Sequence, residues 1–85
     1  MTEKQLLKTE SKMSRTEAAE KLHEIADKIN EGKVELASGS NSVALQPADN
    51  VEFEIEVEEE SDGDISLEVE IEWNDREENE SVEIS

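Results

Sequence analysis

The sequence predicts an α+β fold of two layers, in which one amphipathic helix packs on a mainly antiparallel sheet of four or five strands. Apolar residues recur with helical spacing in one segment, and they alternate strictly with polar residues in the segments that follow. A helix with one apolar stripe and strands with one apolar face each bury these surfaces most economically against one another. The 85 residues suffice for one small domain of marginal stability.

The helix is predicted from about Arg15 to Glu31. Ser14 is a favourable N-cap residue, and Glu17 three positions later completes a capping box. Gly32 stands where a glycine commonly ends a helix. The apolar residues fall on one stripe: Ala18, Leu22, Ile25, Ala26 and Ile29.

Residues 33–50 are predicted to form a hairpin followed by a loop. Placing Leu36 opposite Val43 keeps the apolar side chains of both strands on one face. This register leaves Gly39 and Ser40 as a two-residue loop, and a glycine in the first position favours a type II′ turn.

A second hairpin is predicted from residues 51–60 and 65–73, which both alternate apolar residues with glutamate. A two-residue turn would place Val57 opposite Glu68 and mix the two faces, so the pattern favours a three-residue loop over 61–63. In this register the apolar residues form four facing pairs: Val51–Trp73, Phe53–Ile71, Ile55–Val69 and Val57–Leu67.

The predicted domain organisation has three parts. Residues 1–13 alternate only weakly and are expected to form an N-terminal arm or a short edge strand. Residues 14–73 form the single α+β domain. Residues 74–85 are acidic and polar, and we expect a disordered tail there.

The second face of the later hairpin gathers carboxylates: Glu52, Glu54, Glu56, Glu68, Glu70 and Glu72. Like charges directly opposite each other destabilise a sheet, so this face calls for an explanation. It is interpreted as a solvated surface adapted to high salt, as a docking face for a basic protein, or as a divalent cation site. Asp62-Gly63-Asp64 supplies only a fragment of a calcium loop.

Trp73 is the only tryptophan and ends the last predicted strand on its apolar side. It is interpreted either as a cap on the edge of the core or as an exposed aromatic anchor for a partner or a second subunit. Together with the six glutamates it forms the candidate partner-binding set.

The net charge of −17 argues against nucleic acid and anionic membranes as direct ligands, because both require a basic surface. The remaining partners are a basic protein or a second copy of the chain. The chain has no cysteine and no long apolar run, and a cytoplasmic location is expected.

Few residues suggest catalysis. His23 is the only histidine and precedes Asp27 by four positions, a spacing that could orient an imidazole as a base. Such a pair is far more often a contact on the flank of a helix. There is no glycine-rich phosphate-binding motif and no implied metal or other cofactor. The sequence therefore predicts a protein that is not an enzyme.

Several segments resemble the amphi-Trp domain proteins, which are small, acidic, largely haloarchaeal chains of unknown function. The resemblance covers roughly Lys4 to Trp73 and rests on Ser14-Arg15, Ala18-Ala19, Leu22, Ile25-Ala26-Asp27, Gly32 and Leu67–Trp73. It implies no established activity, and Trp73 alone carries over as the hallmark residue. It favours adaptation to high salt, although the acid is mostly glutamate and six lysines remain.

Two hypotheses follow. The first is a small acidic non-enzymatic module, with a protein-interaction or accessory role and a surface adapted to high salt. The second is a binding module that mimics a polyanion and docks a basic protein through its glutamate-lined face.

Overall fold

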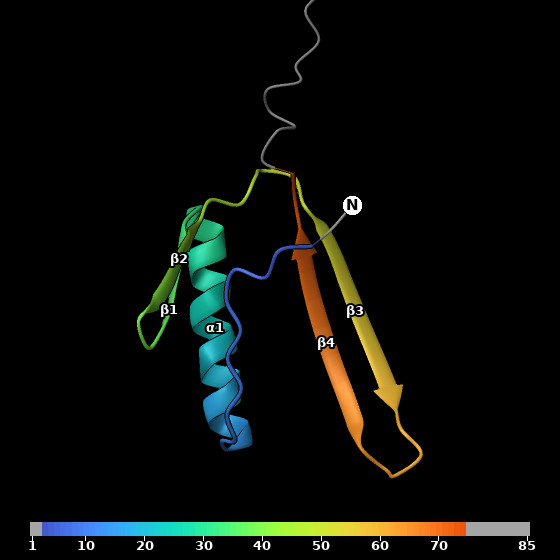
Figure 1. Ribbon diagram of the computed structural model, residues 1–85. Coiled ribbons are helices and arrows are strands. Elements are labelled where there is room, and N and C mark those ends of the chain that lie inside the picture. The colour runs from blue at the N-terminus through green and yellow to red at the C-terminus, as the bar shows by residue number, and fades with distance from the viewer. Residues whose placement is uncertain (1–2, 75–85) are drawn as a thin grey trace, which may run out of the picture. The chain divides into compact units, whose positions relative to one another are not determined.

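A computed structural model describes residues 3–74 of the chain (Figure 1). The chain divides into two compact units, Met1–Pro47 and Ala48–Ser85. The predicted α+β class is confirmed, with one helix and four antiparallel strands in the described residues. The strands form two separate two-stranded sheets. The elements are α1 (Arg15–Glu31), β1 (Val34–Ser38), β2 (Asn41–Leu45), β3 (Glu52–Glu59) and β4 (Ile65–Glu72).

Both ends of α1 carry the hydrogen bonds that the sequence predicts. The backbone N–H of Glu17 donates to the Ser14 hydroxyl over 3.0 Å, and the Ser14 N–H donates to the Glu17 carboxylate over 3.1 Å. At the other end the Lys33 N–H donates to the Lys28 carbonyl over 3.2 Å and the Gly32 N–H donates to the Ile29 carbonyl over 3.0 Å, which is the pattern of a Schellman motif. The helix is therefore bounded by local chemistry.

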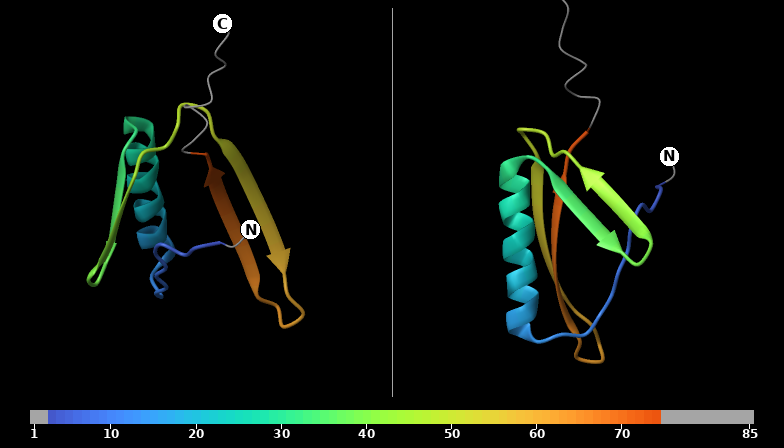
Figure 2. Two further views of the ribbon diagram at one scale, coloured as in Figure 1. Left: turned by 45° about the horizontal axis from the view of Figure 1, so that its top comes forward. Right: turned by 90° about the vertical axis from the view of Figure 1, so that its left-hand side faces the viewer.

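The β1–β2 hairpin has the predicted register, with Leu36 opposite Val43. Gly39 has a φ of 61°, whereas Ser40 has no positive φ, and this combination is that of a type II′ turn. Figure 2 shows the hairpin lying against α1, and β1 contacts the helix. Val34 is 4% exposed and is the only buried side chain among residues 3–74.

The β3–β4 hairpin is also paired as predicted, with Val57 opposite Leu67. The Gly63 N–H donates to the Glu60 carbonyl over 2.8 Å, and the Glu60 N–H donates to the Asp64 carbonyl over 2.8 Å. Gly63 has a φ of 95°, a conformation that costs glycine little. The three-residue loop is therefore confirmed. The pairing stops at Glu52 and Glu72, so Val51 and Trp73 lie one residue beyond the two strands, and the predicted Val51–Trp73 pair is not part of the ladder.

The expected core of β3 and β4 is not buried. Phe53 and Leu67, which lie on the apolar face that was predicted to pack against the helix, are 62% and 67% exposed. The physical reason lies within the unit Ala48–Ser85, whose strands form a single two-stranded ribbon. Such a ribbon has no second layer of its own to cover its apolar face.

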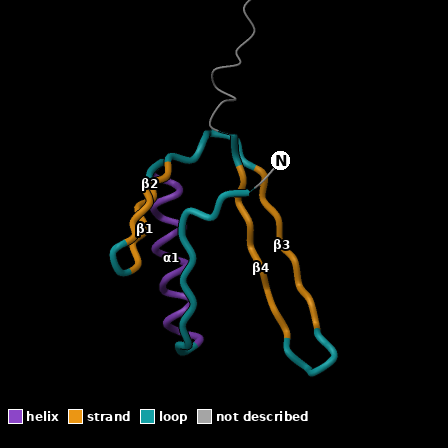
Figure 3. The backbone as a smooth tube through the Cα atoms, in the orientation of Figure 1, coloured by secondary structure: helices purple, strands orange, loops and turns teal. Residues whose placement is uncertain are grey.

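The two ends of the chain add no further strand to the described structure. Residues 3–13 run as a loop and adopt neither helix nor strand (Figure 3). The predicted tail 74–85 lies outside the described residues except for Asn74.

The acidic face of the β3–β4 hairpin

The candidate site is the acidic face of the β3–β4 hairpin, and strand register alone positions its side chains. Successive residues of a strand point to opposite faces, so the glutamates at every second position share one side. The ladder sets them directly opposite one another in three pairs: Glu52–Glu72, Glu54–Glu70 and Glu56–Glu68. All six are exposed. The structure therefore brings together every glutamate of the candidate set.

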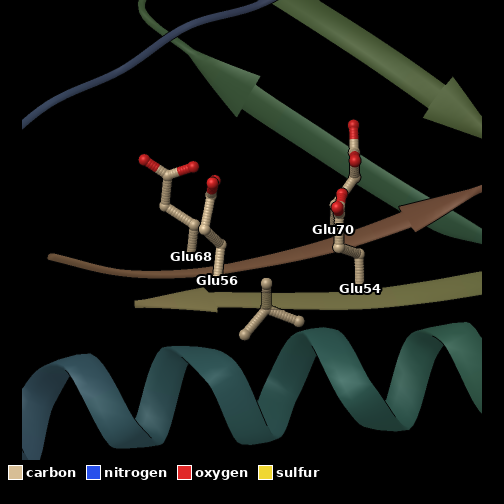
Figure 4. A pocket seen from close by; sticks show the side chains of 5 residues that line it. Glu54, Glu56, Glu68 and Glu70 are labelled. Carbon is tan, nitrogen blue, oxygen red and sulfur yellow. The ribbon is translucent and has the colours of Figure 1, made fainter. Parts of the chain in front are cut away.

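Figure 4 shows how the middle of this face is arranged. Glu56 lies beside Glu68 and Glu54 lies beside Glu70, and the four side chains rise from the same side of the ribbon. They line an open hollow of about 420 Å³. The hollow presents carboxylate oxygens, which accept hydrogen bonds and attract cations.

Charge is divided unevenly between the two units. Residues 48–85 hold 17 of the 25 acidic residues but only one of the eight basic ones. Residues 48–74 contain no basic residue at all. No lysine or arginine of that segment therefore neutralises the face, and its paired carboxylates repel one another across the ladder.

Trp73 lies at the end of the same hairpin, away from the connecting loop. It is half-buried and follows the last residue of β4 directly. A second hollow of about 420 Å³ surrounds this end, lined by Asn50, Val51, Glu52, Glu72, Trp73 and Asn74. The tryptophan is therefore close to the outermost glutamate pair, while the two inner pairs line the first hollow.

The loop between β3 and β4 contains a turn that an aspartate side chain stabilises. The Asp62 carboxylate accepts a hydrogen bond from the Asp64 backbone N–H over 3.0 Å, an arrangement that aspartate commonly makes in turns. Between residues 3 and 74, no three histidine, cysteine, aspartate or glutamate side chains are grouped so that they could hold a metal ion.

His23 and Asp27 are both exposed on α1. The ion pairs in the described part of the chain join other residues, Lys28 to Glu31 over 3.8 Å and Lys33 to Glu35 over 3.7 Å. A contact between His23 and Asp27 is therefore not among the ion pairs of the described residues.

The apolar face of this hairpin is not among the predicted site residues, because the sequence assigns it to the core. The alternation that predicts this face also predicts that it is covered, so the pattern alone does not reveal its exposure. One indication of this exposure is present in the sequence, because a single helix is narrow for covering four strands.

The helix of the described chain is neither long enough nor apolar enough to cross a membrane.

Comparison with known proteins identifies the family of the chain. No curated protein and no solved structure matches the chain. The family model of the Amphi-Trp domain matches residues 1–85, which is the whole chain. The chain therefore belongs to the Amphi-Trp domain family, as its helix signals and the tryptophan that follows its last strand suggest.

Proposed function

We propose that the chain is a small, non-enzymatic cytoplasmic module, with a protein-interaction or accessory role and a surface adapted to high salt. The observation that best supports this proposal is the set of three facing carboxylate pairs on the β3–β4 hairpin. Directly opposite residues have their Cβ atoms only about 4.5–5.5 Å apart, so the paired charges repel strongly in dilute salt.

High salt removes most of this penalty. The Debye length falls from about 8 Å at 0.15 M to about 3 Å at 1 M ionic strength, which is shorter than the distance between facing strand positions. The charged face would then remain hydrated without weakening the hairpin. A surface is adapted to salt in this physical sense when it destabilises the fold at low salt and does not do so at high salt.

The test is thermal unfolding, followed by circular dichroism, in NaCl from about 0.1 M to about 3 M. NaCl is chosen because sulfate would also strengthen burial through its exclusion from the protein surface. The proposal predicts a midpoint that rises steeply with NaCl. A chain that is well folded at the lowest salt concentration and responds little to NaCl would contradict it.

Two variants with the same change in charge test whether the salt dependence arises at the acidic face. Neutralising the face with Glu54→Gln, Glu56→Gln and Glu68→Gln should raise the midpoint at low salt and flatten its salt dependence. The control changes the same charge away from the hairpin, with Glu10→Gln, Glu20→Gln and Glu24→Gln. Equal responses of the two variants would assign the salt dependence to overall charge instead of to this face.

A second candidate function is supported by the hollow between the inner glutamates. Glu54, Glu56, Glu68 and Glu70 line one open concavity from two strands (Figure 4). Four carboxylates on a fixed backbone resemble a short polyanion, and such a surface attracts and orients basic partners. In this alternative the chain docks a basic protein through the acidic face, with Trp73 at its edge.

Capture of poly-L-lysine on immobilised protein at about 0.15 M NaCl tests this alternative. Reversal of three charges in the hollow, by Glu54→Lys, Glu56→Lys and Glu68→Lys, should abolish capture. Reversal at Glu10, Glu20 and Glu24 makes the same change in net charge and should preserve most of it. If both reversals weaken capture equally, binding depends only on net charge and the alternative fails.

A further inference from the structure

The outer edge of β3 is an unpaired strand edge. Among the described strands β3 pairs only with β4, so its other side has no neighbouring strand. All eight residues of β3 are exposed, whereas β4 has two half-buried positions. The strand contains no proline and no bulge, two of the features that commonly keep other strands away from an edge. An edge of this kind is a template for a further strand.

The hairpin loop indicates which backbone groups face this edge. The Glu60 N–H donates to the Asp64 carbonyl over 2.8 Å, so the Glu60 backbone points toward the second strand of the hairpin. In an antiparallel ladder, residues that exchange hydrogen bonds with the partner alternate with residues whose N–H and C=O groups point outward. Counting back from Glu60, the even-numbered glutamates therefore direct their backbone groups toward β4. The backbone groups of Phe53, Ile55 and Val57 face the outer edge.

We infer that the outer edge of β3 binds an extended basic segment of another protein as an added antiparallel strand. The inference rests on the second candidate function above, the docking of a basic protein, and it specifies the conformation and the charge pattern of that partner. Partner residues opposite Phe53, Ile55 and Val57 form the hydrogen-bonded pairs. Partner residues opposite the glutamates form the other pairs, in which the Cα atoms are only about 4.5 Å apart and the side chains lie closer together.

The charge pattern of β3 determines which partner fits. Carboxylates occupy every second position of the strand, on one face: Glu52, Glu54, Glu56 and Glu58. Opposite charges that face each other directly stabilise a strand pair, and like charges destabilise it. A strand with lysine or arginine at every second position would place a basic side chain beside each of these carboxylates. Small or apolar residues between the basic ones would share the face of Ile55.

The strands of the chain itself lack this pattern. A second copy of β3 would also present its odd positions at the edge, so antiparallel pairing would set glutamate opposite glutamate. β1 and β2 contain no basic residue. Residues 3–13 form no strand, and Glu10 interrupts the alternation between Lys8 and Lys12. The edge therefore disfavours the strands of this chain and favours a partner with uninterrupted basic alternation.

Binding of labelled peptides to the full chain in about 0.15 M NaCl, followed by fluorescence anisotropy, tests the inference. One peptide alternates lysine with threonine over the length of β3, and the other has the same composition with its lysines in adjacent pairs. The alternating peptide should bind about tenfold more tightly, because only alternation places every lysine on the acidic face. Equal binding overturns the inference and leaves docking by charge alone. Binding of neither peptide overturns the second candidate function as well.

Methylation of the peptide backbone tests the strand pairing without changing the protein. N-methylation of the threonines removes the N–H groups that would donate to the carbonyls of Phe53, Ile55 and Val57. N-methylation of the lysines removes N–H groups that would point away from β3. The first modification should weaken binding about tenfold, and the second should leave it almost unchanged. Equal weakening by the two modifications overturns the inference.

Two proline variants distinguish the edge of β3 from that of β4. Ile55 lies directly opposite Val69, and each residue directs its N–H group to the outer edge of its own strand. Proline is tolerated in edge strands where the N–H group faces outward. Ile55→Pro should abolish the preference for the alternating peptide, and Val69→Pro should retain it. Loss of the preference in Val69→Pro alone overturns the assignment to β3.

Discussion

Glu56 lies directly opposite Glu68 in the β3–β4 ladder. Two residues further along the same strand and on the same face, Glu58 lies opposite Ser66. The two positions differ mainly in what faces them across the strands, a carboxylate in one case and a hydroxyl in the other. This difference separates the cost of cross-strand repulsion from the effect of net charge.

Charge reversal at Glu56 should therefore stabilise the chain more than the same reversal at Glu58. Glu56→Lys converts a repulsive pair into an attractive one, and cross-strand pairs contribute about 0.2–1 kcal/mol. Urea unfolding in about 0.1 M NaCl measures the difference between the variants, which should shrink in about 1 M NaCl. Equal gains for both lysines at low salt would show that the pairing has no energetic effect.

Removal of the helix cap should destabilise α1. In Ser14→Ala the Glu17 N–H loses its hydroxyl acceptor, and such a change typically costs about 0.5–2 kcal/mol. Loss of helical ellipticity at 222 nm during urea unfolding reports the change. Ser11→Ala, in the segment that is neither helix nor strand, serves as the control and should have almost no effect.

The same cap gives α1 a dependence on pH. The hydrogen bond from the Ser14 backbone N–H, together with the Ser14 side chain, lowers the pKa of Glu17 below its ordinary value. Because the folded pKa is the lower one, the stabilisation is present above the pKa of unfolded glutamate. It is lost as the pH falls through the folded value.

The comparison of wild type with Glu17→Gln from about pH 7 to about pH 2 tests this sign. Wild type should be the more stable protein near neutrality, and the two midpoints should converge in acid. Glu20→Gln removes one charge from the same helix and accounts for the general relief of repulsion. If the difference between wild type and Glu17→Gln persists at the lowest pH, the charge of Glu17 is not its cause.

The loop of the second hairpin should be sensitive to the residue at Gly63. A Cβ atom added there would meet nothing within 4 Å, so the cost of substitution comes from the backbone φ of 95°. Left-handed conformations cost ordinary residues about 1–2 kcal/mol, while asparagine adopts them more readily. Thermal unfolding should rank the proteins as wild type, then Gly63→Asn, then Gly63→Ala. A Gly63→Ala variant as stable as wild type would contradict this conformation.

Much of the fold could be predicted because its determinants are local. Ser14, Glu17 and Gly32 bound the helix through hydrogen bonds within a few residues of each end. The loops at Gly39 and Gly63 fix the registers of the two hairpins, because each loop length is compatible with only one alignment of the apolar faces. The facing glutamate pairs follow from that register, so the acidic part of the candidate site was predictable as well.

Burial was less predictable, because it depends on what lies across an apolar face. Alternation in β3 shows that Phe53 shares a face with Ile55, but it does not indicate which surface covers these side chains. The structure leaves both side chains more than half exposed, whereas it buries Val34 of β1, the strand that contacts α1. Alternation likewise does not specify that the strand ladder stops at Glu72, one residue before the half-buried Trp73.

The sequence by itself determined the helix, the two hairpins, their registers and the concentration of negative charge on one face. Only the tertiary structure decided that the four strands form two separate sheets and that α1 contacts β1. The physical reason is that turns and caps are specified by side chains close together in the chain. The edges of two hairpins present the same backbone N–H and C=O groups whatever their sequence, so strand pattern alone does not determine whether the edges join.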